Sequence, residues 1–210
     1  MAATIDDQKS LREFVGDPID LAVMKARPKL DKYSKEFISR SPFLSLGTAD
    51  SDGKVDVSPR GDAPGFVLVL DDSTIFIPER PGNRRVDSLS NIVSNPNVGL
   101  LFMIPGFEDT LRVNGRASVV TDAALLEQCA VKGKAPKTGI RVDVEEAYIH
   151  CAKAFKRSKL WEPESLQDRS EMPSIAKIIL DQVAEGEGAA DGDVAAGDEL
   201  VEDDYKNNLY

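Results

Sequence analysis

Arginine and turn residues gather at two points of an otherwise acidic chain. The first is Asp56-Val-Ser-Pro-Arg-Gly-Asp62, and the second is Ile75-Phe-Ile-Pro-Glu-Arg-Pro-Gly-Asn-Arg-Arg85. Further along come His150-Cys-Ala-Lys153 and Ser158-Lys-Leu-Trp161, which contains the single tryptophan. Guanidinium groups form charge-assisted hydrogen bonds to phosphate, and an aromatic side chain can stack on a planar ring. Together these residues would suit a phosphorylated planar cofactor.

The first cluster has the alternation of a strand. Its polar side chains fall at every second position: Asp56, Ser58 and Arg60. Alternate residues share one face of a strand, so we expect Val55 and Val57 to point to the core. Pro59 has no N–H for a ladder, which indicates an edge or a bulge where backbone can meet a ligand. A solvated face with an Arg–Asp pair is the other interpretation.

The second cluster precedes a predicted helix over 83–94. Arg80, Arg84 and Arg85 crowd the start of this helix, where each cation opposes the helix dipole by about 0.3–1 kcal/mol. A phosphate would compensate them, because the free N–H groups of a helix N-terminus and guanidinium groups both bind anions. Neutralisation by Glu79 or Asp87 is the alternative.

The elements that position these clusters follow from hydrophobic periodicity and turn residues. Helices are predicted over 4–15, 21–24, 31–39, 83–94, 122–130, 151–155 and 173–183. Strands are predicted over 43–49, 54–60, 66–70, 74–78, 98–104, 110–120 and 140–149. Short strands joined by tight turns indicate a small antiparallel barrel or sandwich. We expect an N-terminal helical segment (1–40) packing on this domain (41–160), followed by C-terminal helices (161–210).

The last part of the chain changes character twice. Residues 184–197 are rich in Gly, Ala, Glu and Asp, which predicts an acidic flexible linker. Residues 198–210 regain apolar side chains at helical spacing, ending in Leu209 and Tyr210. A free tail rarely carries such a stripe, so we expect this helix to dock on the body or on a second subunit.

Composition excludes several classes of protein. The net charge of −10 argues against nucleic-acid binding, which needs Lys and Arg clustered over a whole face. No apolar run approaches the roughly 18 residues of a membrane span, and no signal peptide is evident. Cys129, Cys151 and the single His150 cannot supply a four-ligand zinc site. We therefore expect a cytoplasmic protein with reduced thiols and no metal.

The order of these motifs resembles a known family. A strand, Ser-Pro-Arg-Gly-Asp, a strand ending in Ile-Phe-Ile-Pro, Gly-Asn-Arg-Arg, a helix ending in Asn-Pro, and Thr-Leu-Arg-Val-Asn-Gly follow one another. This set resembles the FMN-binding split-barrel flavoproteins related to pyridoxamine 5′-phosphate oxidase, in a bacterial branch, over residues 30–185. The resemblance implies a split β-barrel of six or more antiparallel strands with helices at both termini. It also implies a homodimer with FMN at the subunit interface.

The resemblance assigns cofactor contacts residue by residue. The implied FMN-binding residues are Ser58, Pro59, Arg60, Gly61, Ile77, Pro78, Asn83, Arg84, Arg85, Thr110, Lys159 and Trp161. Among them, Arg84 and Arg85 match a phosphate clamp, and Trp161 matches an aromatic residue often contributed by the second subunit. His150 and Lys153 are candidates to line the reacting face. From the residues alone, Trp161 could equally be core packing and His150 a structural hydrogen-bonding group.

One departure from the family narrows the function. The oxidases that form pyridoxal phosphate carry Arg-x-His after the tryptophan, whereas this chain continues Glu162-Pro-Glu-Ser-Leu-Gln. Pyridoxamine phosphate is therefore disfavoured as the substrate. The expected function is an FMN-dependent oxidoreductase that transfers electrons between bound flavin and an unidentified small molecule. The alternative is a non-catalytic carrier or sensor that binds flavin, a deazaflavin or haem.

Overall fold

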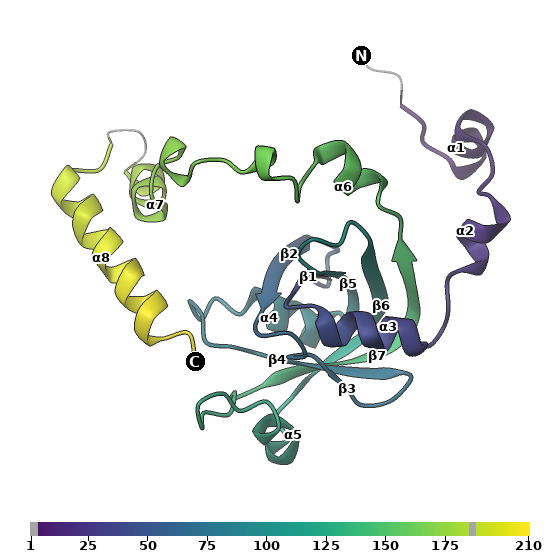
Figure 1. The fold of residues 1–210 in the computed structure, drawn as a ribbon, viewed down its shortest axis with the longest axis horizontal. Helices are drawn as coiled ribbons and strands as arrows, with labels where there is room; N and C mark the ends of the chain where they lie inside the picture. Colours follow the sequence, from purple (N-terminus) through teal and green to yellow (C-terminus); the bar gives the residue numbers. More distant parts are fainter. Residues whose placement is uncertain (1–3, 185–187) are drawn as a thin grey trace.

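Seven antiparallel strands form one sheet that curls into an open barrel in the computed structural model, which describes residues 4–184 and 188–210 (Figure 1). The spatial order is β2-β1-β5-β6-β7-β4-β3. The strands are β1 (Phe43–Ala49), β2 (Val55–Gly61), β3 (Leu68–Val69), β4 (Thr74–Pro78), β5 (Asn97–Met103), β6 (Thr110–Val120) and β7 (Gly139–His150). Within the described chain, the outer strands β2 and β3 are not paired with each other, so the barrel is split.

The barrel core comes from the period-two pattern of its strands. On β1 and β5, alternate side chains such as Leu44, Leu46, Leu100 and Phe102 are almost fully buried. The two longest strands, β6 and β7, pair along their whole length, with a register shift between Asn114 and Gly115. This alternation places one face of the sheet inside the barrel and leaves the other outside.

Helices flank the barrel at both ends of the chain, and two further helices, α4 and α5, connect strands within it. They are α1 (Gln8–Val15), α2 (Asp20–Met24), α3 (Lys32–Arg40), α4 (Asp87–Ser94), α5 (Ala123–Glu127), α6 (Lys153–Ser158), α7 (Ile175–Val183) and α8 (Asp191–Asn207), with 3-10 turns at Pro163–Ser165 and Arg169–Glu171. Asp31 caps α3 by accepting a hydrogen bond from the Ser34 N–H at 2.8 Å. Helix α3 buries Phe37 and Ile38 against the barrel, whereas α1 and α2 bury no side chain.

The orientation predicted for β2 is wrong. Val55 and Val57 point outward and are 67% and 70% exposed. The polar side chains face α4 instead: Asn91 Nδ2 donates to Asp56 Oδ2 at 2.9 Å, and the hydroxyls of Ser58 and Ser88 lie 2.9 Å apart. Because α4 covers this face with polar side chains of its own, the polar residues of β2 find partners there.

Several predicted boundaries also shift. The helix predicted from residue 83 begins at Asp87, because Arg84 and Val86 both adopt left-handed backbone conformations that interrupt it. The strand predicted over 66–70 is reduced to Leu68–Val69. The predicted linker over 184–197 is already helical from Asp191 onward, while its residues 185–187 lie outside the described part of the chain.

The C-terminal segment leaves the barrel at α6 and returns to it at Tyr210 (Figure 1). Between these points α7 packs on α8, with Gly197 facing Ala176 so closely that a Cβ at residue 197 would lie 2.9 Å from the alanine methyl. At its end, the Tyr210 hydroxyl donates to Asp62 Oδ1 at 2.8 Å. Within residues 4–184 and 188–210, no helix combines the length and hydropathy needed to cross a membrane.

Replacement of Gly139 by alanine should destabilise the barrel. An added Cβ at Gly139 would overlap the ring of Phe76, which is fully buried beneath it. Overpacking of this kind costs about 1–3 kcal/mol, so we expect thermal or urea denaturation to show a loss of that size. Gly82→Ala is the matched control, because a Cβ there meets no neighbour. Equal stability of the two variants would contradict this packing.

Candidate functional site

A pocket of about 430 Å³ lies between the end of β2, the segment after β4 and the first turn of α4. Its size is within the range of small-molecule and cofactor sites. It is lined by Ser58, Pro59, Arg60, Gly61, Phe66, Pro78, Glu79, Arg80, Pro81, Gly82, Asn83, Arg85, Val86, Asp87 and Ser88. The two arginine clusters of the sequence therefore meet at one site, although they lie on different elements.

Arg60 is held rigidly in the floor of this pocket. Its Nε donates to Glu79 Oε2 at 3.1 Å, and its Nη1 donates to Ser58 Oγ at 2.8 Å and to the Pro59 carbonyl at 2.9 Å. The side chains of Arg60 and Glu79 are both mostly buried. A guanidinium group fixed in this way is oriented before any ligand arrives.

A second ion pair, between Arg80 and Asp62, joins two walls of the pocket. Arg80 Nε donates to Asp62 Oδ2 at 2.7 Å, and Arg80 Nη1 donates to the Cys129 carbonyl at 2.9 Å. Burial acts to raise the pKa of the Asp62 carboxyl, but hydrogen bonds from the Ala63 N–H, Tyr210 and Arg80 outweigh it and hold the pKa below its ordinary value. The carboxylate therefore stays charged and keeps Arg80 in place.

Arg85 and Arg84 are the cations free to turn toward a ligand. Arg85 Nε lies 2.6 Å from Asp87 Oδ2, but the Arg85 side chain is 76% exposed. An exposed pair of this kind contributes only about 0–1 kcal/mol, so a phosphate can compete with the carboxylate. In the part of the chain that the structure describes, Arg84 forms no ion pair. Of the three arginines before α4, only Arg85 is paired, among the described residues, with one of the two carboxylates considered from the sequence, Asp87, whereas Glu79 pairs with Arg60 on β2.

The N-terminus of α4 opens into the pocket without a side-chain cap. The residue before it, Val86, has a φ of 54° and offers no capping group. The first amides of a helix have no intrahelical acceptor, so those at Asp87 and Ser88 remain available to an anion. A β-branched residue in the left-handed region is strained, and such strain is typical of binding loops. Donors, helix dipole and arginines converge here, which fits a phosphate group.

Other predicted cofactor residues lie away from this pocket. Ile77 is buried in the barrel core, and Thr110 is buried at the end of β6, opposite His150 on β7. Trp161 donates its Nε1–H to the Phe107 carbonyl at 2.7 Å and stacks on Phe155 with ring centroids 5.7 Å apart. Within a single chain, the structure does not bring these residues together with the arginines.

Lys159 and Lys153 accompany Trp161 on the segment after β7. Lys159 is the left-handed residue that ends α6, and its Nζ lies 3.4 Å from Glu162. Lys153 begins α6 and does not line the pocket. Strands β2 and β4 and the loop before α4 thus supply seven predicted residues to the pocket: Ser58, Pro59, Arg60, Gly61, Pro78, Asn83 and Arg85. Arg84 lies on the same loop but does not line the pocket, and the remaining predicted residues lie elsewhere.

His150 belongs to a separate cationic cluster on the outer face of β6 and β7. Its ring centroid is 4.9 Å from that of Tyr148, whose hydroxyl accepts a hydrogen bond from Arg112 at 3.0 Å. Lys25 lies 4.8 Å above the Tyr148 ring. Burial, followed by the charges of Lys25 and Arg112, lowers the pKa of His150 below its ordinary value. A neutral imidazole is the form expected near pH 7.

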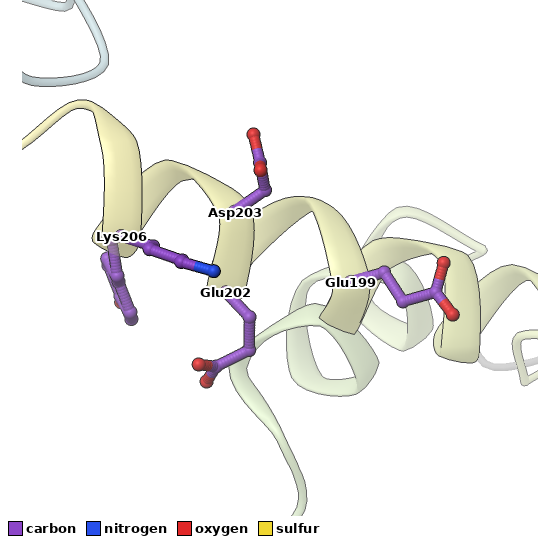
Figure 2. A pocket seen from close by; sticks show the side chains of 5 residues that line it. Glu199, Glu202, Asp203 and Lys206 are labelled. Carbon is purple, nitrogen blue, oxygen red and sulfur yellow. The ribbon is translucent and has the colours of Figure 1, made fainter.

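A second hollow, on α8, has the wrong chemistry for a phosphorylated ligand. It measures about 620 Å³ and is lined by Glu199, Glu202, Asp203, Tyr205 and Lys206. Figure 2 shows the labelled side chains fanning out around one helix instead of converging on a point. Three carboxylates against one ammonium group repel an anion. Among residues 4–184 and 188–210, no cluster of His, Cys, Asp or Glu is arranged to hold a metal ion.

Three contributors to the pocket region escaped the sequence interpretation. Ser88 reaches it from the first turn of α4, and Asp62 reaches it through Arg80. Tyr210 bonds to the same carboxylate from 148 positions away in the sequence. Asp62 is the last residue of the recognised Ser-Pro-Arg-Gly-Asp motif, but the motif does not indicate that Asp62 pairs with Arg80. The sequence around Tyr210 does not indicate that its hydroxyl binds Asp62.

The open antiparallel barrel, with flanking helices and a basic pocket beside β2 and β4, defines a split-barrel protein. Residues 30–151, more than half of the chain, match the family model described as pyridoxamine 5′-phosphate oxidase. The chain belongs to that family, which confirms the resemblance and the fold expected from the sequence. The comparison with curated protein sequences found no match.

Several solved structures are similar to this chain. A putative pyridoxamine 5′-phosphate oxidase of Lactobacillus delbrueckii is 23% identical, with 58% of this chain and 95% of that one covered and a TM-score of 0.47. An FMN-binding protein of Syntrophomonas wolfei is 12% identical (68% and 96% covered, TM-score 0.43). The haem storage protein HutZ of Vibrio cholerae is 17% identical (58% and 94% covered, TM-score 0.41).

The single histidine gives a direct test of the electrostatics on β7. Because burial and neighbouring cations disfavour the imidazolium, we expect the His150 ring protons to titrate in NMR spectra with a midpoint below 6.5. The unfolded chain binds this proton more readily than the folded protein, because His150 keeps its ordinary pKa there. The free energy of unfolding should therefore fall as the pH drops below 6.5. Lys25→Met should raise the midpoint, and Lys54→Met should leave it unchanged. A midpoint above 6.5 would contradict the placement.

Proposed function

We propose that the protein is an FMN-dependent oxidoreductase that transfers electrons between bound flavin and a small molecule. The single observation that supports it is the uncapped start of α4, which opens into the pocket beside Arg60 and Arg85, with Arg84 next to Arg85 on the same loop. Such a site suits the phosphate of FMN, because amide donors and guanidinium groups both favour a dianion. Family membership supports the same choice of cofactor.

The chain's own residues divide the work of holding the cofactor. Arg84 and Arg85 would take the phosphate, since neither is held in a buried ion pair in the described structure. Arg60 is fixed by Glu79 and Ser58, so it would present a guanidinium of fixed orientation. The backbone from Ser58 to Gly61 forms the floor of the pocket on the edge strand. A bound flavin would supply the redox chemistry, which requires no protein nucleophile.

A second copy of the chain would complete the site. The outer face of β2 exposes Val55 and Val57, and the β1 residues paired with them are the small Ala49 and Gly47. This flat apolar surface borders the open edge of the sheet, where another subunit can approach closely. We infer a homodimer in which the partner brings the Trp161 region to the flavin. The expected location is the cytoplasm, where free thiols such as Cys129 and Cys151 stay reduced.

The flavin assignment is tested by the colour of the purified protein and by flavin affinity. Flavin absorbance bands that bleach with NAD(P)H or a substrate would support the enzyme; bands that never bleach would favour a carrier or sensor. A Soret band would replace flavin by haem. Arg84→Ala combined with Arg85→Ala should weaken FMN binding at least tenfold, because each charge-assisted bond contributes about 1.5–3 kcal/mol.

Two comparisons isolate the phosphate clamp in that experiment. Riboflavin lacks the phosphate, so its affinity should change little in the double variant. Arg116→Ala, which removes an exposed arginine from β6 outside the pocket, should bind FMN like the unaltered protein. If the double variant keeps the full FMN affinity, the phosphate does not sit at α4.

The dimer surface on β2 can be tested by adding charge to it. Val55→Lys combined with Val57→Lys should convert the dimer into a monomer in sedimentation velocity, because two buried ammonium groups would be unpaired in the interface. Val93→Lys, on the outer side of α4 and equally exposed, is the control. A dimer that persists in the double variant would place the interface elsewhere.

A further inference from the structure

Tyr210 occupies a polar socket made by residues from three distant segments. Its hydroxyl donates to Asp62 Oδ1 at 2.8 Å, and its backbone oxygen accepts from Lys134 Nζ at 3.0 Å. Arg80 lies 5.5 Å and Lys132 lies 5.8 Å from the centre of the phenol ring. We call these four residues, Asp62, Arg80, Lys132 and Lys134, the tyrosine socket.

The centre of the tyrosine socket is a carboxylate removed from water. The Asp62 side chain is only 3% exposed and accepts three hydrogen bonds, from the Ala63 N–H, Arg80 and Tyr210. A buried carboxylate that loses one of its donors is left with an unsatisfied oxygen, and it can then rotate or shift toward water and carry its bound guanidinium with it. The phenol of Tyr210 is therefore part of what orients Arg80.

The same ion pair belongs to the pocket. Asp62 directly follows Gly61, which lies in the pocket floor, and Arg80 lines the pocket itself. Next to Arg80, Glu79 holds Arg60 on the opposite strand. The segment from 79 to 86 is consequently anchored at its start by two ion pairs, while its far end carries the strained residues Arg84 and Val86.

The socket also provides the attachment of the end of the chain. In the described residues, Tyr210 makes the hydrogen bonds that join residues 188–210 to the barrel. Helix α8 buries no side chain and contacts mainly α7. A segment held at one point can dock and undock at small cost in free energy, and a ligand can bias such an equilibrium.

We propose that Tyr210 is a positioning residue of the pocket, and that its docking in the tyrosine socket is coupled positively to binding of a phosphorylated ligand. The docked phenol fixes Arg80 and with it the wall formed by residues 79–86; a phosphate at α4 stabilises that same wall. Each event thus favours the other, and the coupling is reciprocal. This inference rests on the proposed function only for the identity of the ligand.

The test compares three single variants. Tyr210→Ala should raise the dissociation constant of FMN about tenfold, within the 5–150-fold range of typical site-to-site coupling. The dissociation constant of Tyr210→Phe should lie between those of the unaltered protein and Tyr210→Ala, because this variant keeps the ring next to Arg80 and loses the hydrogen bond to Asp62. Tyr205→Ala, which removes a 52% exposed tyrosine from α8, is the control and should bind FMN normally.

A second readout needs no cofactor. Hydrogen exchange of the amides in residues 79–86 should be faster in Tyr210→Ala than in the unaltered protein without flavin. Inorganic phosphate should slow that exchange, and more so when Tyr210 is present. Melting temperatures of the variants show whether the barrel itself remains folded.

The outcomes separate this inference from the proposed function. Equal FMN affinity and equal exchange of residues 79–86 in the unaltered protein and Tyr210→Ala would overturn the coupling and leave the flavin assignment intact. Failure of the unaltered protein to bind FMN would overturn the proposed function. The exchange measurements with phosphate would then still decide whether Tyr210 positions this wall.

Discussion

The ion pair between Asp62 and Arg80 is the interaction on which the rest of the site depends. It ties the residue after β2 to the segment after β4, and these two elements have no strand pairing with each other in the described structure. In a split barrel the outer strands are not paired, so only side chains can link the elements on the two sides of the opening. The pocket occupies that opening, so its walls keep their spacing through side-chain contacts instead of backbone ladders. Arg60 and Glu79 provide a parallel link nearby.

Much of the barrel could be predicted because its signals are local. Period-two alternation located the long strands, and helical spacing located α1 and α3, whose first amides are capped by Asp7 and Asp31. The direction of β2 could not be predicted in the same way. Alternation defines the two faces of a strand, but the element that packs on the strand decides which face is covered. Here α4 covers the polar face of β2, where Asn91 and Ser88 form hydrogen bonds to it. Apolar side chains were consequently left outside.

The candidate site, too, was predictable in its residue types but not in its backbone geometry. The order of the motifs predicted that both arginine clusters contribute to one site. The left-handed backbone conformations of Arg84 and Val86 could not be predicted, because neither residue type favours positive φ. Because α4 begins only at Asp87, Arg84 and Arg85 do not oppose its dipole from within the helix. They stand before α4 in a loop, next to carboxylates, and not on its first turn. An acidic protein can therefore gather arginines locally, because neighbouring carboxylates such as Glu79 and Asp87 neutralise part of their charge.

Trp161 gives the molecule a built-in optical probe. It is the single tryptophan, it lies where the C-terminal segment leaves the barrel, and its indole N–H is bound to the Phe107 carbonyl. Selectively excited fluorescence therefore comes from one known position. Its emission wavelength reports the polarity at the root of that segment, and energy transfer from the indole to a yellow chromophore would measure their separation directly, in solution and without any label.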